Sequence, residues 1–108
     1  MARRHLNTTT DAVRVLGLHL GAARREQRRT STEIAERAGI TRVTLSRIER
    51  GDPDAAIGLY FEVAMILNVP LFGADSRELA DLAARGERDL ALLPQRIRVR
   101  QVTVDDNF

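Results

Sequence analysis

The chain has no cysteine and no tryptophan, and only 4% of its 108 residues are aromatic. Without cysteine, disulfide bonds and thiolate metal sites are excluded. Hydrophobic residues still make up 44% of the chain, so a core built from aliphatic side chains is possible. This composition favours a small helical protein, and the length predicts one domain with an appendage.

Long apolar runs are also missing. The longest apolar stretches, at residues 55–61 and 63–67, are far too short to span a membrane. The chain opens with a basic stretch, but Arg14 and His19 interrupt the apolar segment that follows, so no secretion signal is expected. We therefore expect a cytoplasmic, nucleoid-associated bacterial protein with no membrane partner.

Lysine is absent, because all 17 basic residues are arginine. The net charge is only +2, but residues 1–54 carry 11 arginines against 7 acids, whereas residues 55–108 carry 6 against 8. Residues 1–54 are therefore expected to bind a polyanion better than residues 55–108. Arginine bonds phosphate and guanine bidentately; the alternative explanation for the missing lysine is the composition of the host genome.

The sequence offers little for catalysis. His5 and His19 have no second histidine or cysteine at metal-binding spacing. No catalytic triad, P-loop or glycine-rich dinucleotide turn is present. We expect no enzyme activity, no metal and no cofactor.

Residues 30–51 organise the chain as two short helices joined by a tight turn. Thr30 is suited to cap the first helix, and Glu33 predicts a capping box with it. Gly39 can end that helix in a left-handed conformation, and Thr41 can cap the next. The spacing is that of a helix-turn-helix.

The second of these helices is predicted to bury Leu45 and Ile48 and to expose its remaining side chains. A helix presented by its N-terminal half, with short polar and guanidinium side chains, suits a DNA major groove. We expect Arg42 and Arg47 to read guanine edges, and Val43 or Thr44 to meet a thymine methyl group. The predicted base-contacting residues are Arg42, Val43, Thr44, Ser46 and Arg47.

Three short segments of this stretch resemble the sequence pattern of the XRE (Cro/cI-like) repressor family. They are Glu33-Ile34-Ala35, Ala38-Gly39-Ile40 and Ile48-Glu49-Arg50-Gly51. The resemblance implies an all-α, five-helix, lambda-repressor-like domain. It also implies a homodimer that places two groove helices about 34 Å apart on palindromic double-stranded operator DNA.

Phosphate contacts are expected around the groove helix, from Arg24, Thr30, Ser31 and Arg50. The role of Arg24 comes from the resemblance, and a solvated helix end that favours cations is an equally good interpretation. The family usually has an apolar residue before the Thr30 cap. Here that residue is Arg29, which we expect to loosen the local packing.

The predicted organisation has four parts: a flexible arm at 1–9, the helix-turn-helix domain at 10–74, a helical extension at 75–94, and a β-strand with an acidic tail at 95–108. Arg3 and Arg4 in the arm could touch DNA, the alternative being a disordered tail. Thr10 is expected to cap the first helix. Gly17 and Gly21 predict close packing of this helix on a neighbour.

A fourth helix is predicted over residues 55–68, with Ile57, Tyr60, Ala64 and Leu67 on its inner face. Its second apolar set predicts a dimer or partner contact by Phe61, Met65 and Ile66. The next helix is expected to start with an Asp75–Glu78 capping box. It should turn Leu79, Leu82 and Ala83 inward and stop at Gly86.

The tail alternates like a strand over residues 95–104, with Ile97 and Val99 on one side and three arginines on the other. A lone strand needs a partner, so two copies could form an intermolecular ribbon. We expect Ile97, Val99 and Phe108 to make dimer or partner contacts. The last four residues either dock on a partner or form a disordered end.

A narrower resemblance rests on Gly51-Asp52-Pro53, on the Ile57-Gly58-x-Tyr60 tract and on the end of the chain. These are similar to HipB-type antitoxins, encoded beside HipA-type kinases. The resemblance implies a repressor that regulates its own operon and binds a HipA-like kinase toxin or its complex. The alternatives are a stand-alone repressor of phage or restriction-control type, and a helix-turn-helix used only for dimerisation. Arg42 and Arg47 argue against the last.

Overall fold

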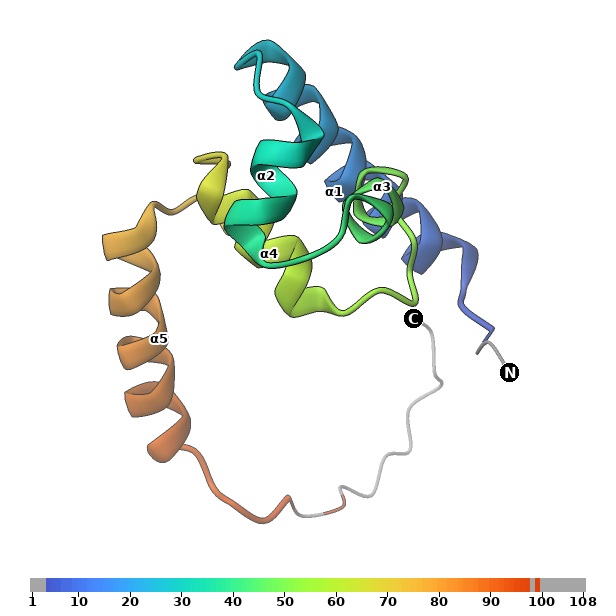
Figure 1. Cartoon of the computed structure of the whole chain (residues 1–108). Helices are drawn as coiled ribbons and strands as arrows, with labels where there is room; N and C mark the ends of the chain where they lie inside the picture. The colour runs from blue at the N-terminus through green and yellow to red at the C-terminus, as the bar shows by residue number, and fades with distance from the viewer. Residues whose placement is uncertain (1–3, 98, 100–108) are drawn as a thin grey trace.

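The computed structural model describes residues 4–97 and 99, and this part of the chain is all-α. Figure 1 shows that the last helix stands apart from the others, which pack together. The helices are α1 (Asn7–Glu26), α2 (Ser31–Ala38), α3 (Arg42–Glu49), α4 (Ile57–Ile66) and α5 (Ser76–Ala91). The prediction of five helices is confirmed.

The predicted strand at 95–104 is not found in the residues that can be described. Residues 95–97 and 99 have no strand conformation. Ile97 and Val99 are almost fully exposed. The rest of the predicted strand, and Phe108, lie outside the described residues.

The core lies where α1, α2, α3 and α4 meet, and it is aliphatic apart from one tyrosine. Burial of apolar surface is the main force that holds these short helices together. The fully buried large side chains are Tyr60, Leu20, Ile34, Leu45, Ile48, Leu67 and Val63.

Helix α1 begins at Asn7, four residues before the start at Asp11 that a Thr10 cap predicts. Thr10 is therefore inside the helix, and Leu6 occupies the cap position without a side-chain cap. Residues 7–9, predicted as arm, are helical. The preceding His5 is also held, because its Nε2 lies 2.9 Å from Oδ1 of Asp54 in the loop after α3.

Close packing of α1 on the end of α3 is confirmed at Gly17. A Cβ at Gly17 would overlap the Ile48 carbonyl oxygen and lie 2.7 Å from the backbone nitrogen of Gly51. Gly51 itself has φ +75°, which a glycine adopts without strain. Gly21 differs, because a Cβ there would make ordinary contacts of 3.5 Å and more with Glu49.

Helix α4 only partly follows the predicted inner face. Tyr60, Val63 and Ala64 are buried, whereas Ile57 is exposed. Ile57 is the first residue of the helix, and 57% of its surface is exposed. The second apolar set, Phe61, Met65 and Ile66, is partly buried and packs against the core.

Two predictions about α5 are wrong. The helix continues through Gly86 to Ala91, and none of its residues is buried within the described chain. Leu82 and Ala83 are exposed rather than inward-facing. The physical reason is the turn at residues 71–74, which points α5 away from the four-helix body (Figure 1). The predicted Asp75–Glu78 capping box is confirmed.

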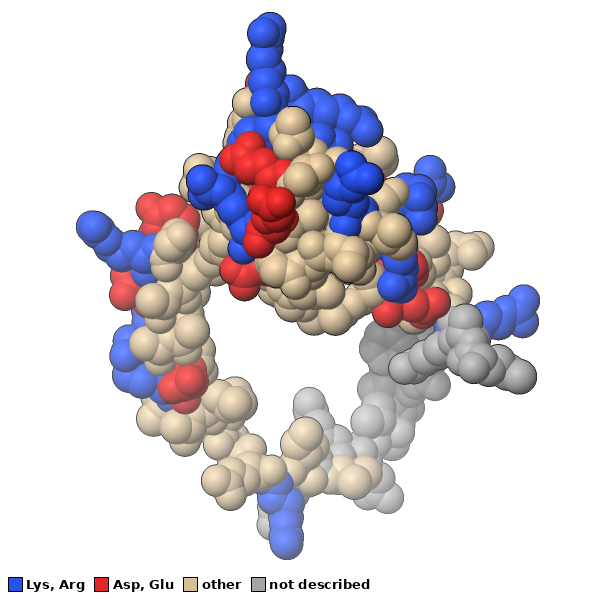
Figure 2. Space-filling model, in the orientation of Figure 1, with Lys and Arg blue, Asp and Glu red and all other residues tan. Residues whose placement is uncertain are grey.

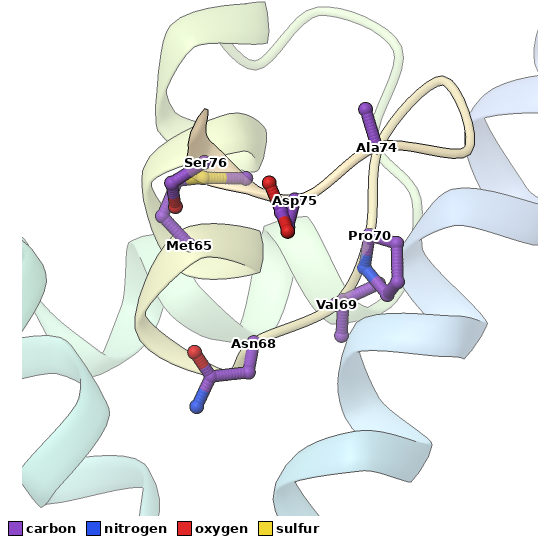
Figure 3. A pocket seen from close by; sticks show the side chains of 7 residues that line it. All are labelled: Met65, Asn68, Val69, Pro70, Ala74, Asp75 and Ser76. Carbon is purple, nitrogen blue, oxygen red and sulfur yellow. The ribbon is translucent and has the colours of Figure 1, made fainter. Parts of the chain in front are cut away.

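A small pocket marks the junction between the body and α5. It is lined by residues from the end of α4, the turn and the start of α5. Figure 3 shows the side chains that line it, which are Met65, Asn68, Val69, Pro70, Ala74, Asp75 and Ser76. Asp75, the one ionisable residue in this lining, caps α5 by accepting from the Glu78 N–H at 2.8 Å.

Candidate nucleic-acid interface

The turn between α2 and α3 is fixed by backbone geometry. Gly39 adopts the left-handed conformation at φ +69°. The backbone N–H of Ile40 donates to the Ala35 carbonyl at 2.9 Å. Thr41 then caps α3, because its hydroxyl accepts from the Thr44 N–H at 3.0 Å. These contacts set the angle at which α3 leaves the body.

The start of α2 differs in part from the prediction. The Thr30 hydroxyl accepts from the Glu33 N–H at 3.1 Å, as a cap should. The Glu33 carboxylate does not complete the box, because it pairs with Arg29 at 3.0 Å instead. Arg29 also donates to the Ile66 carbonyl at 3.0 Å. Arg29 therefore ties α2 to α4, and the expected loosening of the packing is wrong.

Helix α3 turns Leu45 and Ile48 into the core and presents its opposite side to solvent. Val43 has 72% of its surface exposed, which is unusual for a β-branched apolar residue in a well-packed domain. Arg42 and Ser46 are exposed, and Thr44 and Arg47 are half-buried. The five predicted base-contacting residues thus come from one short helix with its apolar stripe buried.

Thr32, which the sequence did not single out, lies beside this surface. The Nη1 of Arg42 reaches the Thr32 hydroxyl at 3.5 Å, so the first turns of α2 and α3 meet there. Ser31 and Thr30 precede Thr32 on the same turn. The signal that could have identified it is its position just after the Thr30 cap, where helix N-termini attract phosphate.

Arg47 is held at the far end of α3 by Asp52. Its Nε donates to Asp52 Oδ2 at 2.7 Å, while Asp52 Oδ1 accepts from the Asp54 N–H at 2.8 Å. The Asp54 N–H and then Arg47 lower the pKa of the Asp52 carboxyl below its ordinary value, so it stays ionised. Sequence reasoning missed Asp52 because nothing in the spacing shows that the loop folds back on α3.

Arg50 and Ser46 form a second pair on the exposed side. Arg50 Nη1 donates to Ser46 Oγ at 2.9 Å, one helical turn away. This contact holds a guanidinium at the C-terminal end of the exposed face, where a DNA backbone phosphate could meet it.

Arg24 lies in a different setting from the other predicted phosphate contacts. Its Nε and Nη2 donate to the Glu49 carboxylate at 2.6 and 3.1 Å, and its Nη1 donates to the Arg29 carbonyl at 3.0 Å. The Arg24 and Glu49 side chains are only 14% and 12% exposed. The bond to Glu49 raises the pKa of Arg24. Nε and Nη2 join α1 to α3, and Nη1 joins α1 to the loop before α2, so the geometry favours a structural role.

The charged surface can be followed in Figure 2. Arginine side chains gather around the end of the body where α1 finishes and α2 begins, with acidic side chains beside them. Arg25 is exposed in the last turn of α1, and Arg28 is exposed in the loop that follows. Among the described residues, no group of three histidine, cysteine, aspartate or glutamate side chains could hold a metal ion. No described helix combines the length and the apolarity that a membrane span requires.

The helix-turn-helix family model matches residues 20–73, which is half of the chain. The chain belongs to this family of DNA-binding proteins, in its XRE (Cro/cI) type, and its fold is lambda-repressor-like. Membership implies sequence-specific DNA binding and a role in transcriptional regulation, in a family of typically non-enzymatic regulators. The chain matches none of the curated proteins and none of the solved structures with which it was compared.

Proposed function

We propose that the chain is an operator-binding repressor that reads the major groove with α3. The observation that carries the proposal is the exposed set Arg42, Val43 and Ser46 on a helix whose other side is fixed in the core. An arginine beside an exposed valine offers a guanine contact and a thymine-methyl contact on adjacent residues. A surface without a nucleic-acid partner has no need of this combination.

The backbone contacts in this proposal come from both sides of α3. Thr30, Ser31 and Thr32 lie at the start of α2, and Arg50 lies at the end of α3. The helix N-terminus adds its own N–H groups for a phosphate oxygen. The structure favours a role for Arg24 in holding α3, so we leave it out of the proposed phosphate contacts.

Arg47 can take part only after a local change. Its Nε is bonded to Asp52, so a guanine contact has to use its Nη atoms or replace that bond. Asp52 then acts as a positioning residue, which limits the rotamers of Arg47 before DNA arrives. We assign the first base contact to Arg42, which is exposed and lacks a carboxylate partner among the described residues.

The experiment compares Arg42→Ala with Arg88→Ala, an exposed arginine on α5. Binding to the chain's own promoter is measured by fluorescence anisotropy, with every single-base variant of the site. Losing Arg42 should weaken the best site by about 1–3 kcal/mol and relax preference at one base pair. Arg88→Ala should leave both unchanged. A loss from Arg42→Ala that is equal for all sequences would show that Arg42 does not read a base.

The finer proposal is that this repressor is also the antitoxin of a HipA-like kinase operon. Its support is the resemblance of the Ile57-Gly58-x-Tyr60 tract and of the chain end to HipB-type antitoxins. In the structure, Tyr60 is buried and its hydroxyl donates to the Asp52 carbonyl at 2.7 Å. Ile57 and Gly58 are exposed one turn earlier, so this tract leaves an apolar residue for a partner to contact.

Co-expression with the neighbouring gene separates the antitoxin from a stand-alone repressor. A stable complex with a kinase-like protein, weakened by Ile57→Asp but not by Arg88→Ala, would support the antitoxin. If the chain purifies without a partner and still binds its own promoter, it is a stand-alone repressor.

A further inference from the structure

The segment that precedes α1 is tied to the loop that follows α3. The Nε2 atom of His5 lies 2.9 Å from Oδ1 of Asp54, across 49 positions of the sequence. An ionised carboxylate only accepts hydrogen bonds, so Nε2 has to carry a proton and donate it. The imidazole is mostly covered, because the His5 side chain is 23% exposed. The contact therefore joins two segments that both lie outside the helices.

Asp54 is in turn bonded to Asp52, and Asp52 holds Arg47. The backbone N–H of Asp54 donates to Asp52 Oδ1 at 2.8 Å, and Asp52 Oδ2 accepts from Arg47 Nε at 2.7 Å. Both oxygens of the Asp52 carboxylate have a donor, so the carboxylate cannot turn without losing one of them. A continuous line of three contacts thus leads from His5 to a predicted base-contacting residue on α3.

Both ends of this line belong to parts of the molecule that are held in place. His5 comes directly before Leu6, which occupies the N-cap position of α1. Helix α1 also packs against the start of the loop, because a Cβ at Gly51 would lie only 2.5 Å from the Cα of Arg14. Arg47 comes from α3, whose apolar stripe is buried. Polar contacts between fixed elements limit side-chain rotamers more effectively than contacts to a mobile loop.

The other contacts of the loop fix its backbone and leave the Asp54 side chain to His5. The Tyr60 hydroxyl donates to the Asp52 carbonyl at 2.7 Å. The Ala55 N–H bonds the same carbonyl at 3.2 Å. These contacts come from the loop itself and from α4, the next helix. Among the hydrogen bonds of the described residues, His5 is the distant partner of this loop.

Arg47 has much to gain from being held before DNA arrives. Its side chain is 40% exposed, and a long exposed side chain loses rotamer freedom when it is ordered in a complex. The bond to Asp52 uses Nε and leaves the two Nη atoms, which can donate to the O6 and N7 atoms of a guanine. A guanidinium held in this way pays less ordering entropy on the correct base and adapts less well to a wrong one.

We propose that His5 and Asp54 are positioning residues for base recognition, which act through Asp52 to hold the Arg47 guanidinium. The inference rests on the proposed function, because it requires α3 in the major groove. It adds the segment before α1 to the residues that set specificity, without a contact between His5 and DNA. It differs from the sequence-based prediction of a flexible arm at 1–9.

The first test measures base preference with the full chain. Arg47→Ala identifies the base pair that Arg47 reads, as the position where preference falls by about tenfold in anisotropy titrations of all single-base variants of the promoter site. His5→Ala and Asp54→Ala should each lower the preference at that base pair by about threefold. The base pair read by Arg42 should be unaffected. Each preference is a ratio of two affinities measured on one protein sample, so an unfolded fraction cancels.

Three further variants separate positioning from a general effect. His5→Gln keeps a side-chain N–H for Asp54 and should retain the preference. His19→Ala removes the other histidine, which is exposed on α1, and should match the wild type. In an Arg47→Ala background, His5→Ala should have no additional effect at this base pair. A wild-type preference in His5→Ala, a loss spread over all base pairs, or an undiminished effect without Arg47 would overturn the proposal.

The second test needs no DNA. Hydrogen exchange of the Arg47 Nε–H with solvent is followed by NMR in the free chain, where the bond to Asp52 should protect it. His5→Ala should speed this exchange by about threefold, as expected for removal of one member of a hydrogen-bond network. His5→Gln should exchange like the wild type. Unchanged exchange in His5→Ala would show that His5 does not hold Arg47 and would overturn the proposal.

Failure of this inference differs from failure of the proposed function. If Arg42→Ala loses preference at one base pair and Arg47→Ala at none, the proposed function stands and the positioning role of His5 and Asp54 falls. A wild-type chain without base preference at any position would overturn the proposed function together with this inference.

Discussion

Helices α3 and α5 both present a long exposed side, but the rest of the molecule holds them very differently. Helix α3 has eight residues and two of them are fully buried. It is held at its start by Thr41, in its middle by Leu45 and Ile48, and at its end by Gly51 against α1. Helix α5 has sixteen residues and a complete capping box, yet none of its residues is buried.

The difference shows that local helix signals and burial are separate properties. An eight-residue helix is marginal in water, so α3 exists because tertiary contacts hold it. Helix α5 is long, well capped and amphipathic, so local sequence can account for its helicity. A fixed helix suits the reading of base edges, which requires a defined position. A free amphipathic helix suits the binding of a partner.

The substitution expected to weaken the hold on α3 most strongly is at Gly17. Replacing Gly17 by alanine puts a Cβ into the backbone of Ile48 and Gly51, so α1 and α3 have to separate. We expect a loss of about 3 kcal/mol in the free energy of unfolding. Chemical denaturation with a circular-dichroism readout measures it.

Gly21→Ala is the matched control, four residues further along the same helix. Its Cβ would lie 3.5 Å or more from Glu49, and alanine favours helix by about 1 kcal/mol. This variant should be as stable as the wild type or slightly more so. Equal destabilisation by both variants would show that the close approach at Gly17 is not what seats α3.

Arg24 tests whether α3 is also held by charge. Arg24→Gln leaves Glu49 half-buried without its guanidinium partner, and we expect a loss of about 2 kcal/mol. The salt dependence of DNA binding should be unchanged if Arg24 makes no phosphate contact. Arg50→Gln should do the opposite, with little change in stability and a salt slope reduced by about 1.

A salt slope that falls for Arg24→Gln, at a temperature where the variant is fully folded, would restore the phosphate role that the family resemblance implied. Denaturation curves and anisotropy titrations on the same samples separate the two cases.

Much of the helix-turn-helix, which is the part held by tertiary contacts, could be predicted from the sequence because the residues that define its helix ends and turn act locally. Thr30, Gly39 and Thr41 act within four residues of themselves, so caps and the turn followed from spacing. The family resemblance depends on the same short stretch. Gly17 could be predicted as a close-packing position because a glycine in a helix interior requires some compensation.

What the sequence could not supply are the pairings between distant segments. Arg29 bonds the Ile66 carbonyl, and Arg24 bonds Glu49, across 37 and 25 positions of the chain. Periodicity showed that Leu82 and Ala83 lie on the apolar side of a helix. It could not show that the turn at 71–74 directs that side away from the core. The same pattern fits a core helix and an interface helix.

The smallest expected effect concerns the loop that follows α3 and holds its end. Tyr60 is buried and donates its hydroxyl proton to the Asp52 carbonyl at 2.7 Å. Tyr60→Phe should cost about 1 kcal/mol of stability near neutral pH. Urea denaturation measures this change, and Phe61→Tyr is a control that adds a hydroxyl to a neighbouring, half-buried position.

The pH dependence gives this prediction a second, independent readout. Burial raises the pKa of Tyr60 from its ordinary value of 10.0 to about 12. The raised folded-state pKa means that the stabilising contribution is complete below pH 10 and is lost as the pH rises towards about 12. The chain has one tyrosine and no cysteine or lysine, so few other groups titrate in this window. Wild-type stability should therefore fall between pH 10 and 12, whereas that of Tyr60→Phe should stay nearly level. Parallel falls in both proteins would mean that the Tyr60 hydroxyl does not hold the loop behind α3.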